Sequence, residues 1–554
     1  MKRTAPVIAA SLGVALVLGC NILDTEPLGT LTDQTFYQTE KDFDAATLAP
    51  YSTMLNLTYD QNGMGWWDGF LLPDDNVQYR DPNRANDVFN WSATNVDFAW
   101  VWATAYKGVM RANVVLDQLP KATKFADPTK KPRYEAEAKF MRAWWYFLLA
   151  RNWGEVPIVT SVPTAVEATM VGNSQPGEVW DLIESDLGFA SQNLPPNYGS
   201  EKGRATSFTA LALLGKVELY RAQWFNQPAK YQEAIADLTA AAAGPFSLVP
   251  DYGDNFREQT ENNSESLFEV QATAGDNINA WGVTDLGGAA GQAWTIYVSP
   301  SCYYGTGGGC APKAWGQGYG QIDITASLNS AFEVGDPRRY YTIYSQSEPY
   351  CACGASNAMV AYDSTWSRTG HTPAKYDRPF DPNRFPNNLS TNNLRLIRLA
   401  DVLLLLAEAK LLGNGDVAAA AALINQVRAR ARQTYTILNG TAPPPTVLAD
   451  VPTGVTSDSL MTLLMHERRV ELALEDAYRY DDLVRWHRAG LITLPNDVAF
   501  GFPESNTNWQ PRNLLKPVPQ RELDVNPNLK HTVILAALSG TCRKRDDCDR
   551  YPEP

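Results

Sequence analysis

The sequence predicts a mainly helical protein in which two helical regions flank an irregular region of loops and short strands. Apolar residues recur at the three- and four-residue spacing of a half-buried helix before residue 245 and again after residue 394. Between residues 246 and 393 this period disappears, and the chain becomes rich in Gly, Asn and aromatic residues. With 554 residues, 44% of them hydrophobic, the chain has ample material for a large core. The predicted regions are residues 1–19, 20–245, 246–393, 394–531 and a tail over 532–554.

The N-terminus carries an export signal. Lys2 and Arg3 precede an apolar run over residues 5–18, which is shorter than the roughly 20 residues that cross a membrane. The run ends in Val-Leu-Gly-Cys, a pattern typical of bacterial lipoprotein signals. We therefore expect residues 1–19 to be a signal peptide and Cys20 to carry the lipid that holds the mature chain on a membrane. An ordinary thiol behind a simple secretory signal is the alternative.

Several amphipathic segments predict helices in the N-terminal region. The helix over residues 133–152 is apolar on nearly every side from Phe140 to Ala150, so other elements should enclose it. Its Trp144 and Trp145 are therefore expected in the core and not on a ligand surface. The helices predicted in this region span residues 41–59, 97–119, 133–152, 175–193, 205–223 and 231–243.

Two stretches without helical period are candidates for a binding surface. Residues 62–100 are rich in Gly, Asp, Asn and Trp, as in GMGWWDGF and LLPDDNVQYRDPNRAND, and residues 246–393 contain many aromatic residues. Long loops are usually functional or disordered, and a high aromatic content opposes disorder. We therefore interpret residues 62–100 as a binding loop, and residues 246–393 as an irregular subdomain.

The C-terminal helical region begins at residue 394 and contains two charges where a surface helix would not place them. Stepped at 100° per residue over residues 460–486, Glu467 and Glu471 fall inside an apolar stripe. Burying them unpaired would cost several kcal/mol, so arginines such as Arg468, Arg469 or one from another helix should pair with them.

These two carboxylates have two interpretations. Residues at i and i+4 lie roughly 6 Å apart, near the carboxylate separation of a retaining glycosidase. We favour a structural ion network, because Glu467 and Glu471 share one core-facing helix instead of flanking a cleft.

Six cysteines remain after Cys20, and an even number in an exported chain indicates disulfides. Cys542 and Cys548 are the natural local pair. Cys351 and Cys353 are too close to favour each other, so they would cross-link to the other loop. A zinc site is the alternative for these four, although their spacing is not the paired C-x-x-C pattern. The six residues are Cys302, Cys310, Cys351, Cys353, Cys542 and Cys548.

The charge of the chain limits its partners. A formal net charge of −14 and a pI near 4.9 argue against nucleic acid and against an anionic membrane surface, because both would be repelled. Neutral ligands remain open.

A series of segments in a fixed order points to a family. These are EAKFMRAWWYFLLARNWGEVPIV, GRATSFTALALLGKVELYRA, GDPRR, IRLADVLLLLAEAK, INQVRARA, HERRVELALEDAYRYDDLVRW and LLKPVPQRELDVNPNL. With the lipoprotein signal they span residues 20–530. They closely resemble the motifs of the SusD/RagB family, the nutrient-binding lipoproteins of bacterial outer membranes.

The resemblance implies a mostly helical fold in which tetratricopeptide-like helix pairs form a scaffold and an irregular loop and short-strand subdomain lies over it. It also implies a surface protein that sits above a SusC-like TonB-dependent transporter and captures oligosaccharides, or in some cases peptides, for import. No catalysis, cofactor or metal is implied. The cysteines and the tail over residues 532–554 depart from the family pattern, which weakens any transfer of ligand identity.

Sugar rings present apolar faces and a perimeter of hydroxyls, so a glycan site needs exposed aromatic rings with polar groups nearby. Both irregular stretches have this composition, although any one tryptophan there can instead pack its loop onto the scaffold. Trp66, Trp67, Trp281 and Trp315 are favoured because each lies beside Gly or Asp. The candidate ligand-binding residues are Trp66, Trp67, Asp75, Arg80, Trp91, Trp281, Trp294, Tyr303 and Trp315.

Two other functions compete with glycan capture. Peptide or other nutrient capture on the same fold is the second hypothesis, and a charged groove would favour it. A secreted hydrolase is the third, but the chain has only four histidines and neither H-E-x-x-H nor G-x-S-x-G. The glycines of residues 305–309 lack the Lys-Ser/Thr that a phosphate loop requires.

Overall fold

The computed structural model describes residues 36–58, 74–81, 84–273, 294–300, 320–352, 358–376, 390–475 and 478–532. Helices dominate this part of the chain, and its strands are two to five residues long. The mainly helical fold predicted from the sequence is confirmed.

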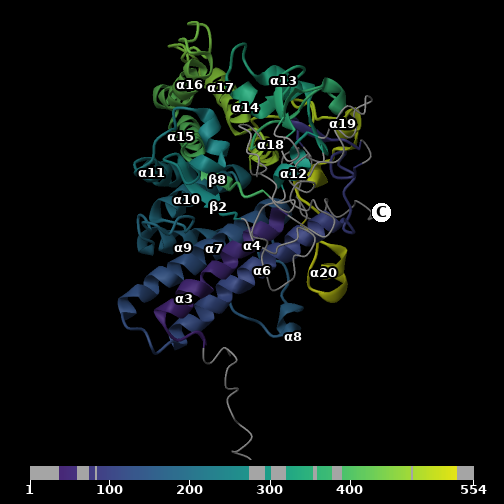
Figure 1. The fold of residues 1–554 in the computed structure, drawn as a ribbon. Helices are drawn as coiled ribbons and strands as arrows, with labels where there is room; N and C mark the ends of the chain where they lie inside the picture. Colours follow the sequence, from purple (N-terminus) through teal and green to yellow (C-terminus); the bar gives the residue numbers. More distant parts are fainter. Residues whose placement is uncertain are drawn as a thin grey trace, which may run out of the picture.

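The first half of the chain forms a succession of packed helices, which Figure 1 shows in purple to teal. Each of α6, α7, α9 and α10 packs against the next long helix along the chain. This is the tetratricopeptide-like scaffold of helix pairs that the family resemblance implies. The helices are α3 (Glu40–Ala46), α4 (Leu48–Leu55), α6 (Val96–Gln118), α7 (Lys131–Trp153), α8 (Ala165–Ala168), α9 (Glu178–Asn193), α10 (Ser207–Trp224) and α11 (Lys230–Ala242).

The prediction of a single helix over residues 41–59 is wrong, because this segment forms two helices. α3 ends at Ala46, α4 begins at Leu48, and a 3-10 turn follows over Asn56–Thr58. Pro50 lies in the first turn of α4, where its missing N–H costs no hydrogen bond. In one continuous helix the same proline could not donate to Ala46.

Short antiparallel strand pairs connect distant segments. β1 (Val77–Tyr79) pairs with β3 (Ile322–Ile324), so that Val77 lies opposite Ile324. The other pairs are β2 (Ser266–Val270) with β8 (Leu394–Arg398), β4 (Ile343–Tyr344) with β7 (Thr372–Pro373), and β5 (Pro349–Ala352) with β6 (Ala358–Ala361). Short helices α12 (Trp294–Val298), α13 (Ala326–Ala331) and α14 (Arg338–Thr342) complete the described part of this irregular region.

The C-terminal helices extend the scaffold, with α15 packing on both α11 and α16. The predicted helical start at residue 394 is wrong, because Leu394–Arg398 forms β8 and the helix begins only afterwards. The assumption of one helical period across residues 460–486 is also wrong, because α17 ends at Leu472 and α18 begins at Tyr478. Leu474 adopts a left-handed conformation, φ +65°, which a right-handed helix cannot accommodate. The helices are α15 (Leu399–Asn414), α16 (Val417–Asn439), α17 (Ser457–Leu472), α18 (Tyr478–Arg488), α19 (Pro503–Asn508) and α20 (Gln520–Val525).

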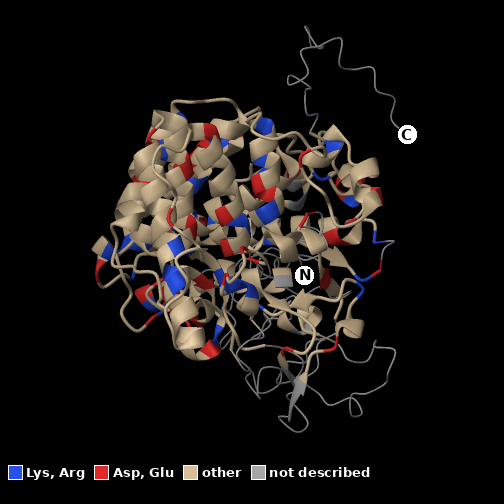
Figure 2. Cartoon of the chain, turned by 90° about the horizontal axis from the view of Figure 1, so that it is seen from above, with Lys and Arg blue, Asp and Glu red and all other residues tan. Residues whose placement is uncertain are grey.

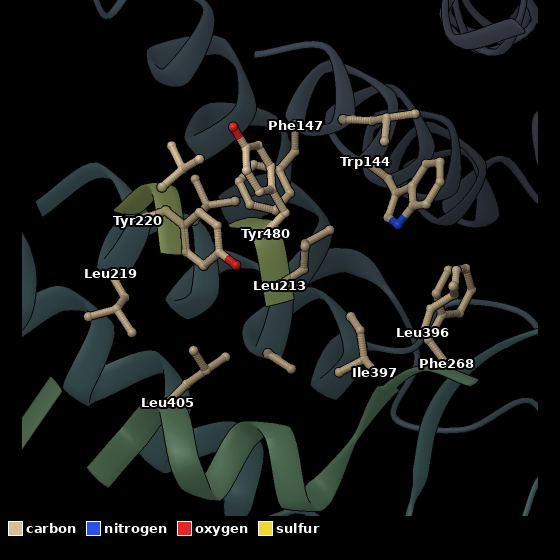
Figure 3. Packing of buried hydrophobic residues seen from close by; sticks show 14 of the residues in the cluster. Trp144, Phe147, Leu213, Leu219, Tyr220, Phe268, Leu396, Ile397, Leu405 and Tyr480 are labelled. Carbon is tan, nitrogen blue, oxygen red and sulfur yellow. The ribbon is translucent and has the colours of Figure 1, made fainter. Parts of the chain in front are cut away.

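The core lies where the scaffold meets β2, β8 and α18. Trp144 and Trp145 of α7 are 5% and 0% exposed, so their predicted place in the core is confirmed. A Cβ on Gly108 of α6 would lie 2.2 Å from the Trp145 ring, so this glycine sets how closely the two helices approach. Figure 3 shows side chains from α7, α10, β2, β8, α15 and α18 converging here: Phe147, Leu213, Tyr220, Phe268, Ile397, Leu405 and Tyr480.

Candidate functional site

The carboxylates of Glu467 and Glu471 on α17 are paired with arginines from other segments. Arg428 Nη1 lies 2.9 Å from Glu467 Oε2, and Arg398 Nη1 lies 2.6 Å from Glu471 Oε1. The Nη1 of Arg338 contacts both carboxylates and lies 2.9 Å from Glu471 Oε2. Arginines on α16, β8 and α14 therefore hold α17 in place.

The pKa of Glu471 reflects the arginines around its carboxylate. Burial alone would raise its pKa, but the nearby charges of Arg430, Arg398 and Arg338 outweigh burial and hold the pKa well below its ordinary value. Glu467 and Glu471 are 1% and 0% exposed, so a substrate cannot reach either carboxylate. The structural ion network predicted from the sequence is confirmed.

The arginines that follow Glu467 directly in the sequence are not its partners. Arg468 pairs with Asp401 and with a carboxylate on α18, whereas Arg469 pairs with Asp75. Successive helical residues point about 100° apart, so neither arginine reaches back to the face that carries the two glutamates. The alternative prediction, that arginines from other segments pair with Glu467 and Glu471, is confirmed.

The network also ties the irregular region to the scaffold. Arg398 lies 2.8 Å from Glu265, just before β2, and 2.7 Å from Glu475, just after α17. Lys375, which follows β7, donates to Glu475 at 2.9 Å. Figure 2 shows basic and acidic positions, in blue and red, in the middle of the molecule as well as along its edges. These pairs fix β2, β7 and β8 to the end of α17.

The two aromatic-rich stretches predicted as binding surface are joined by one strand pair. β1 lies within the first stretch and β3 lies within the second, and the two strands pair. The Arg80 N–H donates to the Gln321 carbonyl at 2.8 Å, and the Gly320 N–H donates to the Ser299 carbonyl at 3.0 Å. These contacts bring part of each stretch together at the β1–β3 pair, which we call the strand junction.

Asp75 lies at this junction and is 3% exposed. Its carboxylate lies 2.6 Å from Arg479 Nε and 3.1 Å from Arg469 Nη2. Burial alone would raise its pKa, but these two arginines lower it below the ordinary value. Burial and the Asp75 charge raise the pKa of neighbouring Asp74 to about 8. The structure therefore places Asp75 in an ion pair that anchors β1 to α17 and α18.

Arg80 and Trp91 occupy half-buried positions at the edge of the same region. Arg80 Nη1 donates to the Gly320 carbonyl at 3.2 Å, and Arg368 donates to the Arg80 carbonyl at 3.0 Å. The Trp91 ring packs edge-on against Phe98, with ring centroids 5.5 Å apart. Trp91 thus contributes to packing this loop on the scaffold.

The remaining candidates lie outside the described residues: Trp66, Trp67, Trp281, Tyr303 and Trp315. Trp294 is the first residue of α12, and its side chain is likewise outside the description. The same holds for the lipid-attachment residue Cys20, for the predicted disulfides and for the tail beyond residue 532.

A serine and a histidine that no sequence motif connects lie together beside β4. His371 Nδ1 is 3.0 Å from Ser345 Oγ, and His371 Nε2 is 3.2 Å from the Asn329 amide nitrogen. Asn329 uses its oxygen to accept from Arg339, so its amide group donates to Nε2. The ring proton therefore sits on Nδ1, which leaves His371 unable to act as base for the Ser345 hydroxyl.

The imidazole of this pair is also held neutral. Burial and then the Arg339 charge lower the pKa of His371 below its ordinary value. The geometry is that of a structural hydrogen-bond chain.

No group of three or more His, Cys, Asp or Glu side chains within the described residues is placed to hold a metal ion. Among the same residues, no helix combines the length and apolar character needed to cross a membrane.

Two family models match the chain. The model described as the SusD family matches residues 264–533, and the model described as starch-binding associating with outer membrane matches residues 73–219. The two matches together take in the strand junction, helices α6 to α9 of the scaffold and the ion network around α17.

Known proteins are similar over almost the whole chain. A SusD-like protein of Bacteroides ovatus is 27% identical over 543 residues, which is 92% of this chain and 86% of that protein. SusD-like protein P25 of Formosa agariphila is 25% identical over 552 residues, 93% of this chain and 96% of that protein. A solved structure titled laminarin binding SusD-like protein is 26% identical, with a TM-score of 0.69, and covers 90% of this chain and 100% of that one.

Proposed function

Because the chain belongs to the SusD/RagB family, we propose that it binds an oligosaccharide or polysaccharide nutrient at the cell surface and delivers it to a SusC-like TonB-dependent outer-membrane transporter. The observation that carries this proposal is the likeness, over that protein's full length, to a laminarin-binding SusD-like protein. The transporter and the direction of delivery are inferred from the family resemblance.

The proposed location follows from the N-terminus and the family. One of the matching family models is described as associating with the outer membrane. In our proposal Cys20 carries the lipid anchor, and the short segment after it holds the folded chain on the outside of the cell.

We assign the glycan to the two aromatic stretches that meet at the strand junction. Aromatic rings supply flat apolar area at little entropic cost, and sugar rings stack on such faces. The proposed platform consists of Trp66, Trp67, Trp281 and Trp315, and Trp294 and Tyr303 are further candidate contacts. Arg80 supplies a guanidinium at the strand junction, and Asp75 and Trp91 hold the junction in position.

The chemistry proposed for this site is binding without turnover. The two carboxylates that could have formed a glycosidase pair are buried in ion pairs. The Ser345–His371 pair lacks the proton arrangement that a nucleophile needs. A protein that captures a polymer for import has to release it unchanged, which fits this arrangement.

The test is a tryptophan-fluorescence titration of the full chain, extracted from membranes with detergent. The chain is titrated with laminarin, starch and xyloglucan oligosaccharides, and with a mixture of neutral and charged peptides. A saturable change with one of the glycans, and none with peptides, is the expected result.

Two results would overturn the proposal. A response to peptides alone would move the function to peptide capture on the same fold. Shortening of the bound glycan during incubation, seen by chromatography, would make the protein a hydrolase.

A further inference from the structure

A cleft opens between the loop that joins α9 to α10 and the turn that leads into β2. Its volume is about 370 Å³, and its lining comes from residues 196–206, 245–246 and 262–269. Figure 1 shows α9, α10 and β2 together on one side of the molecule, apart from α12 and α13. Since α12 and α13 flank β3, the cleft is separate from the strand junction.

The loop that forms one wall is held by ion pairs. Arg204 lies 2.6 Å from Glu137 on α7 and 2.9 Å from Glu201 within the loop. Gly203 has φ +86°, and a Cβ there would lie 2.3 Å from the Gln271 side chain. Only glycine allows the loop to pass this close.

The turn that forms the opposite wall is equally fixed. The side-chain amides of Asn262 and Gln271 donate to each other at 3.0 and 3.1 Å. Asn262 itself adopts a left-handed conformation, φ +51°. Strained positions of this kind are often found at ligand sites. Both walls are therefore formed before any ligand arrives, which lowers the entropic cost of binding.

The charged groups deep in the cleft are already satisfied. The Glu269 carboxylate accepts from the Asn262 N–H and from the Asn393 amide, and Arg204 is paired as described. Within the described residues, Asn197 Nδ2, Lys202 Nζ and Ser266 Oγ have no partner. The cleft thus offers an amide, an ammonium and a hydroxyl that remain available to a ligand.

An apolar surface completes the site. Phe246 is half-buried, with its ring 5.9 Å from that of Phe208, and Phe268 is a buried residue of the lining. A ligand that suits the cleft combines an apolar face with hydroxyl or ether oxygens as acceptors. A peptide ammonium group would find no free carboxylate at the floor.

From this combination we propose that the cleft is a second saccharide-binding site, which takes a neutral disaccharide or the end of a neutral glycan chain. The inference rests on the proposed function, and it assigns to that function a second point of contact. A polymer held at both sites would bind with an affinity higher than either site provides alone.

The test uses Lys202 as a reporter. Its amine is exposed and is acylated by an N-hydroxysuccinimide ester, which mass spectrometry of the full chain locates residue by residue. At a disaccharide concentration about three times Kd, the unoccupied fraction falls about fourfold, so acylation of Lys202 should slow about fourfold. Laminaribiose and cellobiose are the neutral probes, glucuronate is the anionic probe, and exposed Lys121 is the internal control.

Variants locate the protected site. Phe246→Ala should abolish protection of Lys202, whereas Phe246→Tyr, which keeps the ring, should retain it. Phe225→Ala, which removes a half-buried ring at the end of α10 far from the cleft, is the matched control and should retain protection. The double change Trp66→Ala and Trp67→Ala should also retain it.

The outcomes separate this inference from the proposed function. Protection that is absent with both neutral sugars, that appears only with glucuronate, or that survives Phe246→Ala would overturn the second site. If fluorescence still reports glycan binding in that case, the proposed function stands and only the cleft assignment fails. Loss of both signals would overturn both.

Discussion

The Nη1 of Arg398 lies 2.6 Å from Oε1 of Glu471, and both side chains are at most 2% exposed. Arg398 is the last residue of β8 and directly precedes α15, whereas Glu471 lies in the last turn of α17. The ion pair therefore joins the sheet that borders the irregular region to the helix that carries the most distinctive motif of the sequence.

Removing Arg398 should damage the whole fold. Arg398→Ala leaves the carboxylates of Glu471 and Glu475 buried with one partner fewer, so we expect the free energy of unfolding to fall by about 3–5 kcal/mol. Urea unfolding followed by circular dichroism measures it. Asp450→Ala is the control, because the Asp450 carboxylate that pairs with Arg432 is 60% exposed, and its loss should cost less than about 1 kcal/mol. Similar losses in the two variants would refute the role of the buried network.

The buried ion network also predicts how the free energy of unfolding depends on pH. The folded-state pKa of Glu471 is depressed from the ordinary 4.5, so the unfolded chain takes up a proton here before the folded chain does. Its stabilising contribution is complete above about pH 4.5 and is lost as the pH falls towards the folded pKa. The difference in unfolding free energy between the native chain and Glu471→Gln should therefore shrink between about pH 6 and about pH 3. A difference that stays constant would contradict the assignment.

Much of the fold could be predicted from the period of apolar residues, and the errors have local causes. Helices α6, α7, α9, α10 and α11 fall within a few residues of their predicted ranges. Pro50 and Leu474 interrupted two segments whose apolar period continues across the break. The segment Leu394–Arg398 was missed because a short buried strand and the start of a buried helix have the same apolar composition.

The ion network was predictable in kind but not in its members. Two glutamates on an apolar stripe require cations, and this follows from the sequence alone. Arg398 and Arg338 lie 73 and 133 positions from Glu471, so only the folded chain shows which arginines arrive. The same limit applies to the cleft beside β2, whose two walls share no motif and meet only through the tertiary fold.

Close packing between α6 and α7 gives a test of the scaffold. Gly108→Ala places a methyl group inside the Trp145 ring, so we expect it to destabilise the protein by about 1–3 kcal/mol or more. Gly188→Ala is the matched control on α9, where an added Cβ meets nothing within 4 Å. Gly188→Ala should stabilise the protein by about 0.5–1 kcal/mol, since alanine has a higher helix propensity than glycine. Thermal unfolding of both variants checks the prediction, and destabilisation by Gly188→Ala would count against the packing described.

Asp75 should act as a positioning residue. Asp75→Ala leaves Arg469 and Arg479 without their shared carboxylate at the strand junction, so it should lower both the melting temperature and the affinity for glycan. Trp66→Ala should lower affinity while leaving the melting temperature unchanged. Differential scanning fluorimetry and glycan titration of the same preparations separate the two effects. An Asp75→Ala variant with native stability and weakened binding would instead make Asp75 a direct ligand contact.

We propose that the aromatic stretches at the strand junction bind a glycan, and the affinity of tryptophan variants tests this proposal. Affinity for the glycan that gives the strongest fluorescence response is measured by calorimetry for the native chain and for a variant with alanine at Trp66, Trp67, Trp281 and Trp315. Trp100→Ala, which changes a half-buried tryptophan of α6 that is not among the candidate ligand-binding residues, is the control. Stacking is worth about 0.5–1.5 kcal/mol for each aromatic pair, so the fourfold variant should lose at least about tenfold in affinity while the control loses little. Native affinity in the fourfold variant would contradict the claim.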